Sequence, residues 1–336
     1  LVGVELAPIG PERSFFLAHL EHVDATVGLA ASWLLDQGVR VIPGLGRGRT
    51  LRLEPSLTVT DDELARGLEA LDALANVYAR GDWAALVRPV LGSRQVAVRD
   101  LRALERPVLS STPAEPAERP GRFAFLMHPT SPDDHARTTP AFAGLSSAEL
   151  RDLTDWAAAR PSHAPVCFLP AVRSPAGALA QGWLVSLTDT PATFRDRPRD
   201  AVVRDVRAAA ETARRLGADV LGLGAFTSIV TRNGDDLHDL PLAVTTGNAL
   251  TVALAIEGVA LATGRLGRDL DRSRGCVLGL GAVGSAAASL LAERVPDLVL
   301  CGNPARTERD ARRALELADG IYARAARGVP AEDEVG

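Results

Sequence analysis

Apolar and polar positions recur along this chain with two different periods, and each period predicts its own type of element. Alternating or wholly apolar short runs predict strands at 2–6, 39–43, 50–54, 123–128, 218–224, 275–278 and 297–301. Spacings of three and four residues predict helices at 23–37, 145–159, 199–216 and 249–262, and the arms of 172–187 predict a β-hairpin. The mixture predicts an α/β fold class.

Two helices carry more specific expectations. Thr60 and Glu63 have the spacing of a capping box, and the helix behind them places four leucines on one face that we expect to be core: Leu64, Leu68, Leu71 and Leu74. The stretch 249–262 is apolar nearly all round and too short to span a bilayer, so it predicts a buried helix. The strand at 218–224 is expected to continue into 225–231.

A glycine turn separates the strand at 275–278 from an Ala- and Leu-rich helix. Gly279, Gly281 and Gly284 match G-x-G-x-x-G, in which the glycines allow a tight turn, approach of a pyrophosphate and close helix packing. Ala282 and Val283 open the helix, whose N–H groups would face the phosphates. The strand at 297–301 completes a β-α-β unit. A structural glycine turn without a ligand is the alternative.

The end of the second strand of this unit predicts the coenzyme. NAD-specific turns usually place Asp or Glu there to bind the ribose hydroxyls. Here the chain has Gly302 and Asn303, followed by Arg306, which could pair with a 2′-phosphate. NADPH is therefore expected rather than NADH.

Composition limits the classes of function. The chain has 336 residues, 46% of them hydrophobic and 24% charged, with a net charge of −5, which predicts a soluble globular protein with no nucleic-acid or membrane partner. Three scattered cysteines give neither a disulfide framework nor a metal site, and a cytoplasmic location fits best. All 37 basic residues are arginines, so the chain has no lysine for a Schiff base.

The composition shifts along the chain predict four parts: an α+β unit at 1–92, a Pro-rich linker at 93–121, a substrate region at 122–272 and an incomplete nucleotide-binding domain at 273–336. The chain opens on Leu1 within an apolar run and stops about one helix after the second nucleotide-fold strand. We therefore expect a fragment of a longer protein.

The order of residues 1–92 resembles the small C-terminal domain of class III pyridoxal-phosphate aminotransferases, most clearly at LRLEPSLTVTDDEL, residues 51–64. The resemblance implies that Arg52 binds the α-carboxylate of an amino-acid substrate; an exposed strand arginine is the alternative. Pyridoxal phosphate and its lysine would belong to an upstream domain. Class III enzymes are commonly dimers, so the parent protein is expected to be a homodimer.

Residues 123–313 resemble the aldehyde-forming long-chain acyl-acyl-carrier-protein reductases. GLGAFTSIV at 222–230, TTGNALT at 245–251 and LVLCGNPAR at 298–306 carry the resemblance, in order and at near-family spacing. It implies that NADPH reduces an acyl-carrier-protein or acyl-coenzyme A thioester, held on an enzyme cysteine, to an aldehyde. We take four small polar residues of these stretches as substrate-binding candidates: Thr227, Ser228, Thr246 and Asn248.

The catalytic residues stay unassigned. The family's nucleophilic cysteine lies well beyond the glycine turn, and Cys167, Cys276 and Cys301 match no catalytic position. His128 ends a predicted strand and is a site candidate, although a hydrogen-bonded structural histidine is the alternative. The arginine face of the helix at 199–216 fits an acidic carrier protein or a solvated surface.

Together, the two resemblances predict a parent protein that reduces an acyl thioester and then aminates the aldehyde to a primary amine. A class III aminotransferase as the main activity is an alternative. A module that binds a nucleotide or a carrier protein without catalysis is another. A plain dehydrogenase is less well supported, because no His–Asp pair lies near the glycine turn.

Overall fold

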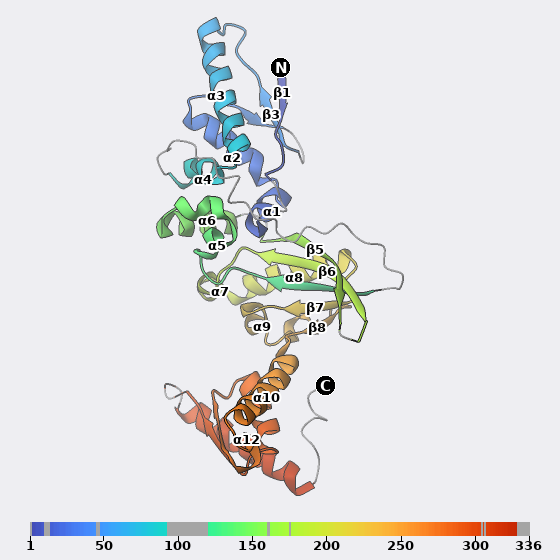
Figure 1. Cartoon of the computed structure of the whole chain (residues 1–336). Helices are drawn as coiled ribbons and strands as arrows, with labels where there is room; N and C mark the ends of the chain where they lie inside the picture. The colour runs from blue at the N-terminus through green and yellow to red at the C-terminus, as the bar shows by residue number, and fades with distance from the viewer. Residues whose placement is uncertain are drawn as a thin grey trace. The chain divides into compact units, whose positions relative to one another are not determined.

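The computed structural model describes residues 2–9, 14–44, 48–92, 120–159, 162–174, 176–303, 305 and 307–327. The chain divides into two compact units, Leu1–Thr245 and Thr246–Gly336. The fold is mixed α/β, with a mostly parallel five-stranded sheet flanked by helices and two smaller sheets (Figure 1). The predicted α/β class is confirmed, whereas nearly all of the predicted linker at 93–121 lies outside the described residues.

The first unit begins with a three-stranded antiparallel sheet and the helices packed on it. β3 is the central strand and pairs with β1 on one side and β2 on the other. The elements of this part are β1 (Val2–Glu5), α1 (Phe15–His22), α2 (Ala25–Asp36), β2 (Ile42–Pro43), β3 (Thr50–Leu53), α3 (Asp61–Arg80), α4 (Trp83–Val87) and the 3-10 helix η1 (Arg88–Leu91).

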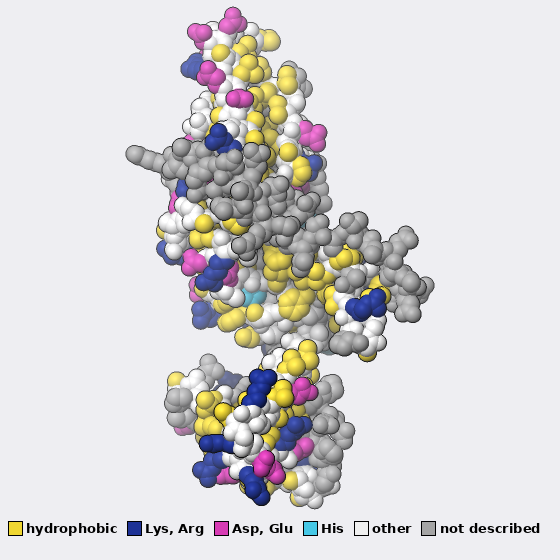
Figure 2. Space-filling view, in the orientation of Figure 1, with side chains coloured by type: hydrophobic (Ala, Val, Ile, Leu, Met, Phe, Trp, Pro, Cys, Tyr) yellow, Lys and Arg dark blue, Asp and Glu magenta, His cyan; other side chains and the backbone are white. Residues whose placement is uncertain are grey.

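The predicted capping box of α3 is confirmed, but its predicted core face is only partly buried. Thr60 accepts a hydrogen bond from the Glu63 backbone, and the Glu63 carboxylate accepts one from the Thr60 backbone. Leu74 is buried, whereas Leu64 and Leu68 are exposed; hydrophobic side chains are visible at the surface of this region (Figure 2). The first turns of α3 extend past the residues that would cover them, so the prediction was wrong for these two leucines.

The five-stranded sheet has the order β5-β6-β4-β7-β8. β4 pairs in parallel with both β6 and β7, β7 pairs in parallel with β8, and β5 runs antiparallel to β6, which confirms the predicted hairpin. The elements here are β4 (Gly121–Met127), α5 (Asp134–Thr138), η3 (Pro140–Gly144), α6 (Ser147–Ala158), β5 (His163–Arg173), β6 (Leu179–Leu187), α7 (Pro191–Asp196), α8 (Arg199–Arg215), β7 (Val220–Leu223), α9 (Phe226–Val230), η4 (Asp235–Leu237) and β8 (Ala243–Thr245).

Helices cover both faces of this sheet. α8 buries a stripe of small and β-branched residues against β4, β6 and β7, as its periodicity predicts. α1 packs on the opposite face, where Ala18 meets Ala164 and Val166 of β5. One expectation was wrong: the continuation of β7 at 226–230 is the short helix α9 rather than an extended strand.

One hydrophobic core joins residues from both sides of the undescribed segment at 93–119. Leu34 and Leu86, from α2 and α4, belong to the same buried cluster as Phe142, Leu150 and Leu153. Arg88 strengthens this junction, because its guanidinium donates to the Gly144 carbonyl at 3.1 Å and pairs with Glu149 at 3.5 Å. Residues 1–92 and the segment that carries α5 and α6 therefore pack as one body.

The second unit contains the predicted β-α-β arrangement, with β9 and β10 paired in parallel. Its elements are α10 (Asn248–Arg265), η5 (Leu270–Arg272), β9 (Arg274–Leu278), α11 (Ala282–Ala292), β10 (Asp297–Cys301) and α12 (Thr307–Arg327).

The prediction that the apolar helix at 249–262 is buried was wrong. Only Val252 and Ile256 of α10 are buried, against α11, whereas Leu250, Leu254 and Leu261 are each more than half exposed. A helix with apolar residues on every side is buried only where other segments pack against it, and its own sequence pattern does not show which sides those are. In the part of the chain that the structure describes, no helix has the length and hydropathy needed to cross a membrane.

The shared core of the first unit predicts the effect of truncating Phe142, which is fully buried. We expect Phe142→Ala to lower the free energy of unfolding by about 3–5 kcal/mol, because it leaves a cavity in the core. Trp33 and Trp83 are buried in the same core, so their fluorescence in a denaturant titration reports this loss. Leu57→Ala, at a fully exposed position, is the control. A tryptophan transition that Phe142→Ala leaves unchanged would contradict the shared core.

Candidate functional site

His128 joins the carboxyl ends of β4 and β7 in the five-stranded sheet. Its Nε2 accepts a hydrogen bond from the Phe226 backbone N–H at 3.0 Å, and its Nδ1 lies 2.8 Å from the Pro129 carbonyl. Because Nε2 accepts, Nδ1 must carry the hydrogen and donate it to Pro129. The ring also meets Phe194 edge-on, with centroids 5.0 Å apart. Both ring nitrogens are thus occupied, which favours the structural interpretation of this histidine over a catalytic one.

This bridge lies where ligands commonly bind in open α/β sheets. The chain leaves β4, returns as β6 on one side and then crosses to β7 on the other side, so the strand order reverses at β4. Parallel sheets bind ligands beyond the carboxyl ends of the strands at such a point. Ala225, directly after β7 and Gly224, has a φ of +46°, a conformation that costs a non-glycine residue energy.

Thr227 and Ser228, two of the predicted substrate residues, follow this strained residue. The Thr227 hydroxyl is buried and donates to the Gly224 carbonyl at 2.7 Å, and the Ser228 hydroxyl donates to the Ala225 carbonyl at 2.9 Å. Both hydroxyls therefore stabilise the first turn of α9. Thr246 and Asn248 belong to the other unit, at the start of α10, where the Asn248 N–H lies 3.4 Å from the Thr246 hydroxyl.

Arg52 lies on β3, the central strand of the small antiparallel sheet, opposite Gly3 and Ile42. Its guanidinium forms an ion pair with Glu54 two residues along the chain. A substrate carboxylate would have to compete with Glu54 for this guanidinium. The ion pair with Glu54 accounts for this half-buried strand arginine without a ligand. The substrate role of Arg52 stays a prediction.

The glycine turn has the geometry that its sequence predicts. Gly279 follows β9 with a φ of +91°, and its N–H donates to the Cys301 carbonyl of β10 at 2.8 Å. A Cβ at Gly284 would lie 1.9 Å from the Gly279 carbonyl oxygen, so only glycine lets α11 approach the strand this closely. At Gly281 a Cβ would meet no atom within 4 Å, which leaves open space before the helix.

The N-terminus of α11 faces that open space. Gly281 is the N-cap and contributes no side chain, so no side chain caps the N–H groups of the first turn, at Ala282, Val283 and Gly284. The first N–H groups of a helix have no partner within it and carry the positive end of its dipole. Backbone N–H groups, a positive dipole end and free space together are what a pyrophosphate requires.

A carboxylate from α12 lies beside the end of β10, and the sequence did not lead us to predict it there. Asp310, in the first turns of α12, accepts a hydrogen bond from the Asn303 N–H at 2.6 Å, and its Cβ closely approaches Gly302. The Asn303 side-chain oxygen accepts from the Ala305 N–H at 2.9 Å. An acidic residue early in the helix after β10 was the available signal. Arg306 lies outside the described residues, so its predicted contact with a 2′-phosphate stays a prediction.

Two of the three cysteines, Cys167 and Cys276, lie in surroundings that do not activate a thiol. Burial raises the pKa of Cys167, and the hydrogen bond that Cys276 makes to Cys301, 3.8 Å away between Sγ atoms, raises the pKa of Cys276. A nucleophilic cysteine needs a lowered pKa. Among the described residues, no group of three or more His, Cys, Asp or Glu side chains is placed to hold a metal ion.

Neither the family models nor the curated proteins contain a match to this chain.

The buried histidines of the first unit predict how its stability depends on pH. Burial lowers the pKa of His135 from 6.5 to about 4, and burial also lowers the pKa of His128 and of His163. The unfolded chain therefore binds protons more readily, so stability is complete above pH 6.5 and falls as the pH drops toward 4. For His135 the loss is about 3 kcal/mol.

His135→Gln, which cannot take up this proton, should flatten the pH dependence of the free energy of unfolding, measured by denaturant titrations between pH 7 and pH 4. Exposed His238→Gln is the matched control. If the His135→Gln variant loses stability with falling pH as steeply as the parent chain, His135 is not held neutral in the folded state.

Proposed function

We propose that the second unit binds NADPH at the glycine turn, as part of an enzyme that reduces an acyl thioester to an aldehyde. The observation that carries the proposal is the turn itself: a left-handed Gly279, an open Gly281 and a Gly284 that no other residue can replace without moving α11. Each feature has its own role in holding a dinucleotide. A turn with only a structural role requires close packing at Gly284 but not the open space at Gly281.

Residues of this chain would hold the coenzyme by its phosphates. The N–H groups of Ala282, Val283 and Gly284 would bind the pyrophosphate, while Asn303 and Arg306 would contact the adenosine ribose and its 2′-phosphate. When bound, NADPH supplies the hydride that reduces the acyl carbon. The chain's own contribution is to bind and orient the coenzyme, and none of its cysteines is proposed as the nucleophile.

The thioester part of the proposal rests on the order of the three sequence stretches, and the fold is compatible with it. The first stretch begins within β7, and the second begins at the last residue of β8. Both strands belong to the parallel part of the sheet, so both stretches leave it at the carboxyl edge, where substrates commonly bind. An acyl-carrier-protein or coenzyme A thioester is the proposed substrate class.

Residues 1–92 enter the proposal as the small domain of a class III aminotransferase, which would aminate the aldehyde in a larger parent protein. This chain has no lysine, so it cannot hold pyridoxal phosphate as a Schiff base. Arg52 is the proposed carboxylate-binding residue, in competition with Glu54. The competing proposal is a module that binds a nucleotide or a carrier protein without catalysis. NADPH consumption on addition of an acyl thioester distinguishes the two when it is measured on the longer parent protein, because this chain holds no proposed nucleophile.

Substitution at the third glycine tests coenzyme binding. We expect Gly284→Ala to weaken NADPH binding about tenfold or more, because the new methyl group pushes α11 and its N–H groups away from the turn. Fluorescence titration of NADPH measures the dissociation constant. Gly320→Ala is the matched control, since a Cβ at this glycine of α12 meets nothing within 4 Å. Equal binding by both variants would leave the turn without a role in coenzyme recognition.

The choice between NADPH and NADH depends on two side chains of opposite charge. We expect Arg306→Ala to weaken NADPH about 10–100-fold and to leave NADH unchanged, because only NADPH has a 2′-phosphate to pair with. Asp310→Asn should strengthen NADPH binding, because it removes a negative charge near Asn303 and keeps a hydrogen-bond acceptor. Titrations of both coenzymes check this. Tighter binding of NADH than of NADPH by the unsubstituted chain would contradict the role proposed for Arg306.

A further inference from the structure

Two of the three cysteines of the sequence come together in the second unit. Cys276 lies within β9 and Cys301 is the last residue of β10, and their Sγ atoms are 3.8 Å apart. In the parallel register Cys276 lies opposite Val299, two residues before Cys301. Side chains two residues apart in a strand point to the same face. Both thiols therefore belong to one face of the two-stranded sheet.

Solvent reaches this face of the sheet. Cys276 is exposed and Cys301 is half-buried. Leu278 and Val299, which share the face with the two cysteines, are 80% and 40% exposed. Cys167, in the first unit, is buried. A small reagent can therefore reach Cys276 in the folded chain, and Cys167 provides a shielded thiol for comparison.

Two neighbouring thiols can exchange with a small disulfide such as oxidised glutathione in two steps. The Cys276 thiolate attacks one sulfur of the glutathione disulfide, which forms a mixed disulfide and releases one glutathione thiolate. The Cys301 thiolate then attacks the Cys276 sulfur, which closes the Cys276–Cys301 bond and releases the second glutathione thiolate. The protein loses two electrons and two protons, and both glutathione thiolates take up the protons to become thiols.

The position of the two cysteines favours the second step and keeps the product reducible. The attack is intramolecular, so the effective concentration of the Cys301 thiol is about millimolar or higher. A disulfide bond is about 2 Å long, so the sulfur atoms must approach each other by about another 2 Å. Because the two residues are diagonal neighbours, this closure pulls on the end of β10. A disulfide that distorts its surroundings is reduced more easily than a relaxed one.

We propose that Cys276 and Cys301 form a reversible dithiol–disulfide site that exchanges with small disulfides of the glutathione type. The role differs from that of a catalytic thiol. The hydrogen bond to Cys301 raises the pKa of Cys276, so little thiolate is present near neutral pH and exchange is slow. The nearby second thiol determines how far the exchange proceeds.

One hydrogen bond connects this site to the glycine turn. The Cys301 carbonyl accepts from the Gly279 N–H at 2.8 Å. Closure of the disulfide displaces Cys301 and with it the acceptor of this bond. We therefore expect the Gly279 amide to exchange with solvent faster in the disulfide form than in the dithiol form. This expectation requires no bound coenzyme.

Trypsin separates the two cysteines, because cleavage after Arg274, Arg294 and Arg306 places them in the peptides 275–294 and 295–306. The full chain would be incubated with oxidised glutathione, its remaining thiols alkylated, and the product digested without reductant. We expect the two peptides to be joined by a disulfide, in a single chain whose intact mass has lost two hydrogen atoms. Excess reduced glutathione should separate them, and Cys167 should stay a thiol.

Substitutions assign the second step. Cys301→Ser removes the thiol that closes the bond, so we expect about tenfold more glutathione to stay on Cys276 than in the parent chain. Cys167→Ser is the matched control and should form the disulfide as the parent chain does. Glutathione retained on Cys276 of the parent chain, or a disulfide that joins two chains, would overturn the proposal without any variant. Equal exchange of the Gly279 amide in both forms would overturn the connection to the turn.

Discussion

The second unit depends on one close contact, the approach of Gly284 in α11 to the carbonyl oxygen of Gly279 at the end of β9. The absence of a side chain at Gly284 lets α11 start directly above the strand. From that position Leu291 reaches the buried residues Val252 and Ile256 of α10, which form the small core of the unit. The same contact sets the direction in which the N-terminus of α11 points. Core packing and the proposed phosphate site therefore have one structural cause.

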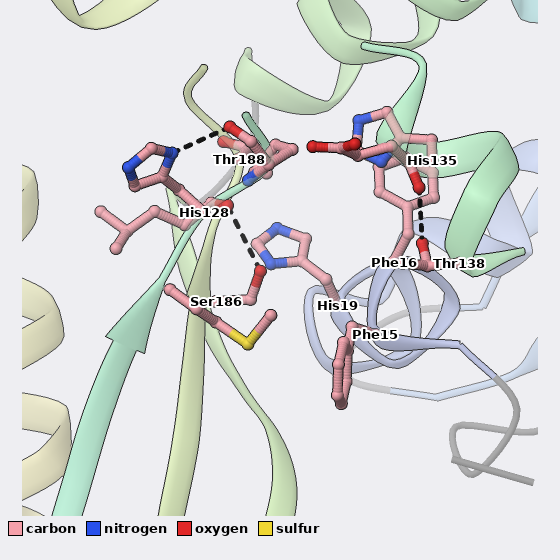
Figure 3. Close-up of a pocket in the computed structure, with 12 residues that line it drawn as sticks. Phe15, Phe16, His19, His128, His135, Thr138, Ser186 and Thr188 are labelled. Atoms are coloured by element: carbon pink, nitrogen blue, oxygen red, sulfur yellow. Dashed lines mark hydrogen bonds between the residues drawn. The ribbon is translucent and has the colours of Figure 1, made fainter. Parts of the chain in front are cut away.

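In the first unit the comparable constraint is the position of β4 between β6 and β7. Nε2 of His128 links the loop after β4 to the segment after β7, while Nδ1 donates to the carbonyl of the next residue, Pro129. His128 also lines the neighbouring cavity of about 140 Å³ at the carboxyl ends of β4 and β6 (Figure 3). His135 is only seven residues away but leaves Nε2 unused. The two histidines therefore differ: His128 links two strand ends by a hydrogen bond, whereas the His135 ring is buried against Phe16.

The sequence predicted elements better than it predicted their surroundings. The residues of α8, the capping box of α3 and the β-α-β unit could be derived, because periodicity, caps and glycine turns are local features. The exposure of Leu68 and of Leu250 could not, because burial depends on which distant segments pack against a helix. Asp310 was missed for the same reason: it approaches Asn303 only because α12 folds back on β10. The cavity at Thr188 joins segments more than a hundred residues apart.

The central claim is that NADPH binds at the glycine turn through backbone N–H groups. Amide hydrogen exchange of the full chain, with and without NADPH, measures those groups directly. Amide exchange at 279–285 is expected to be slower when NADPH is present, with α8 of the first unit unchanged as an internal reference. Exchange at 279–285 that NADPH does not alter at saturating concentration would contradict it, and so would protection confined to another part of the chain.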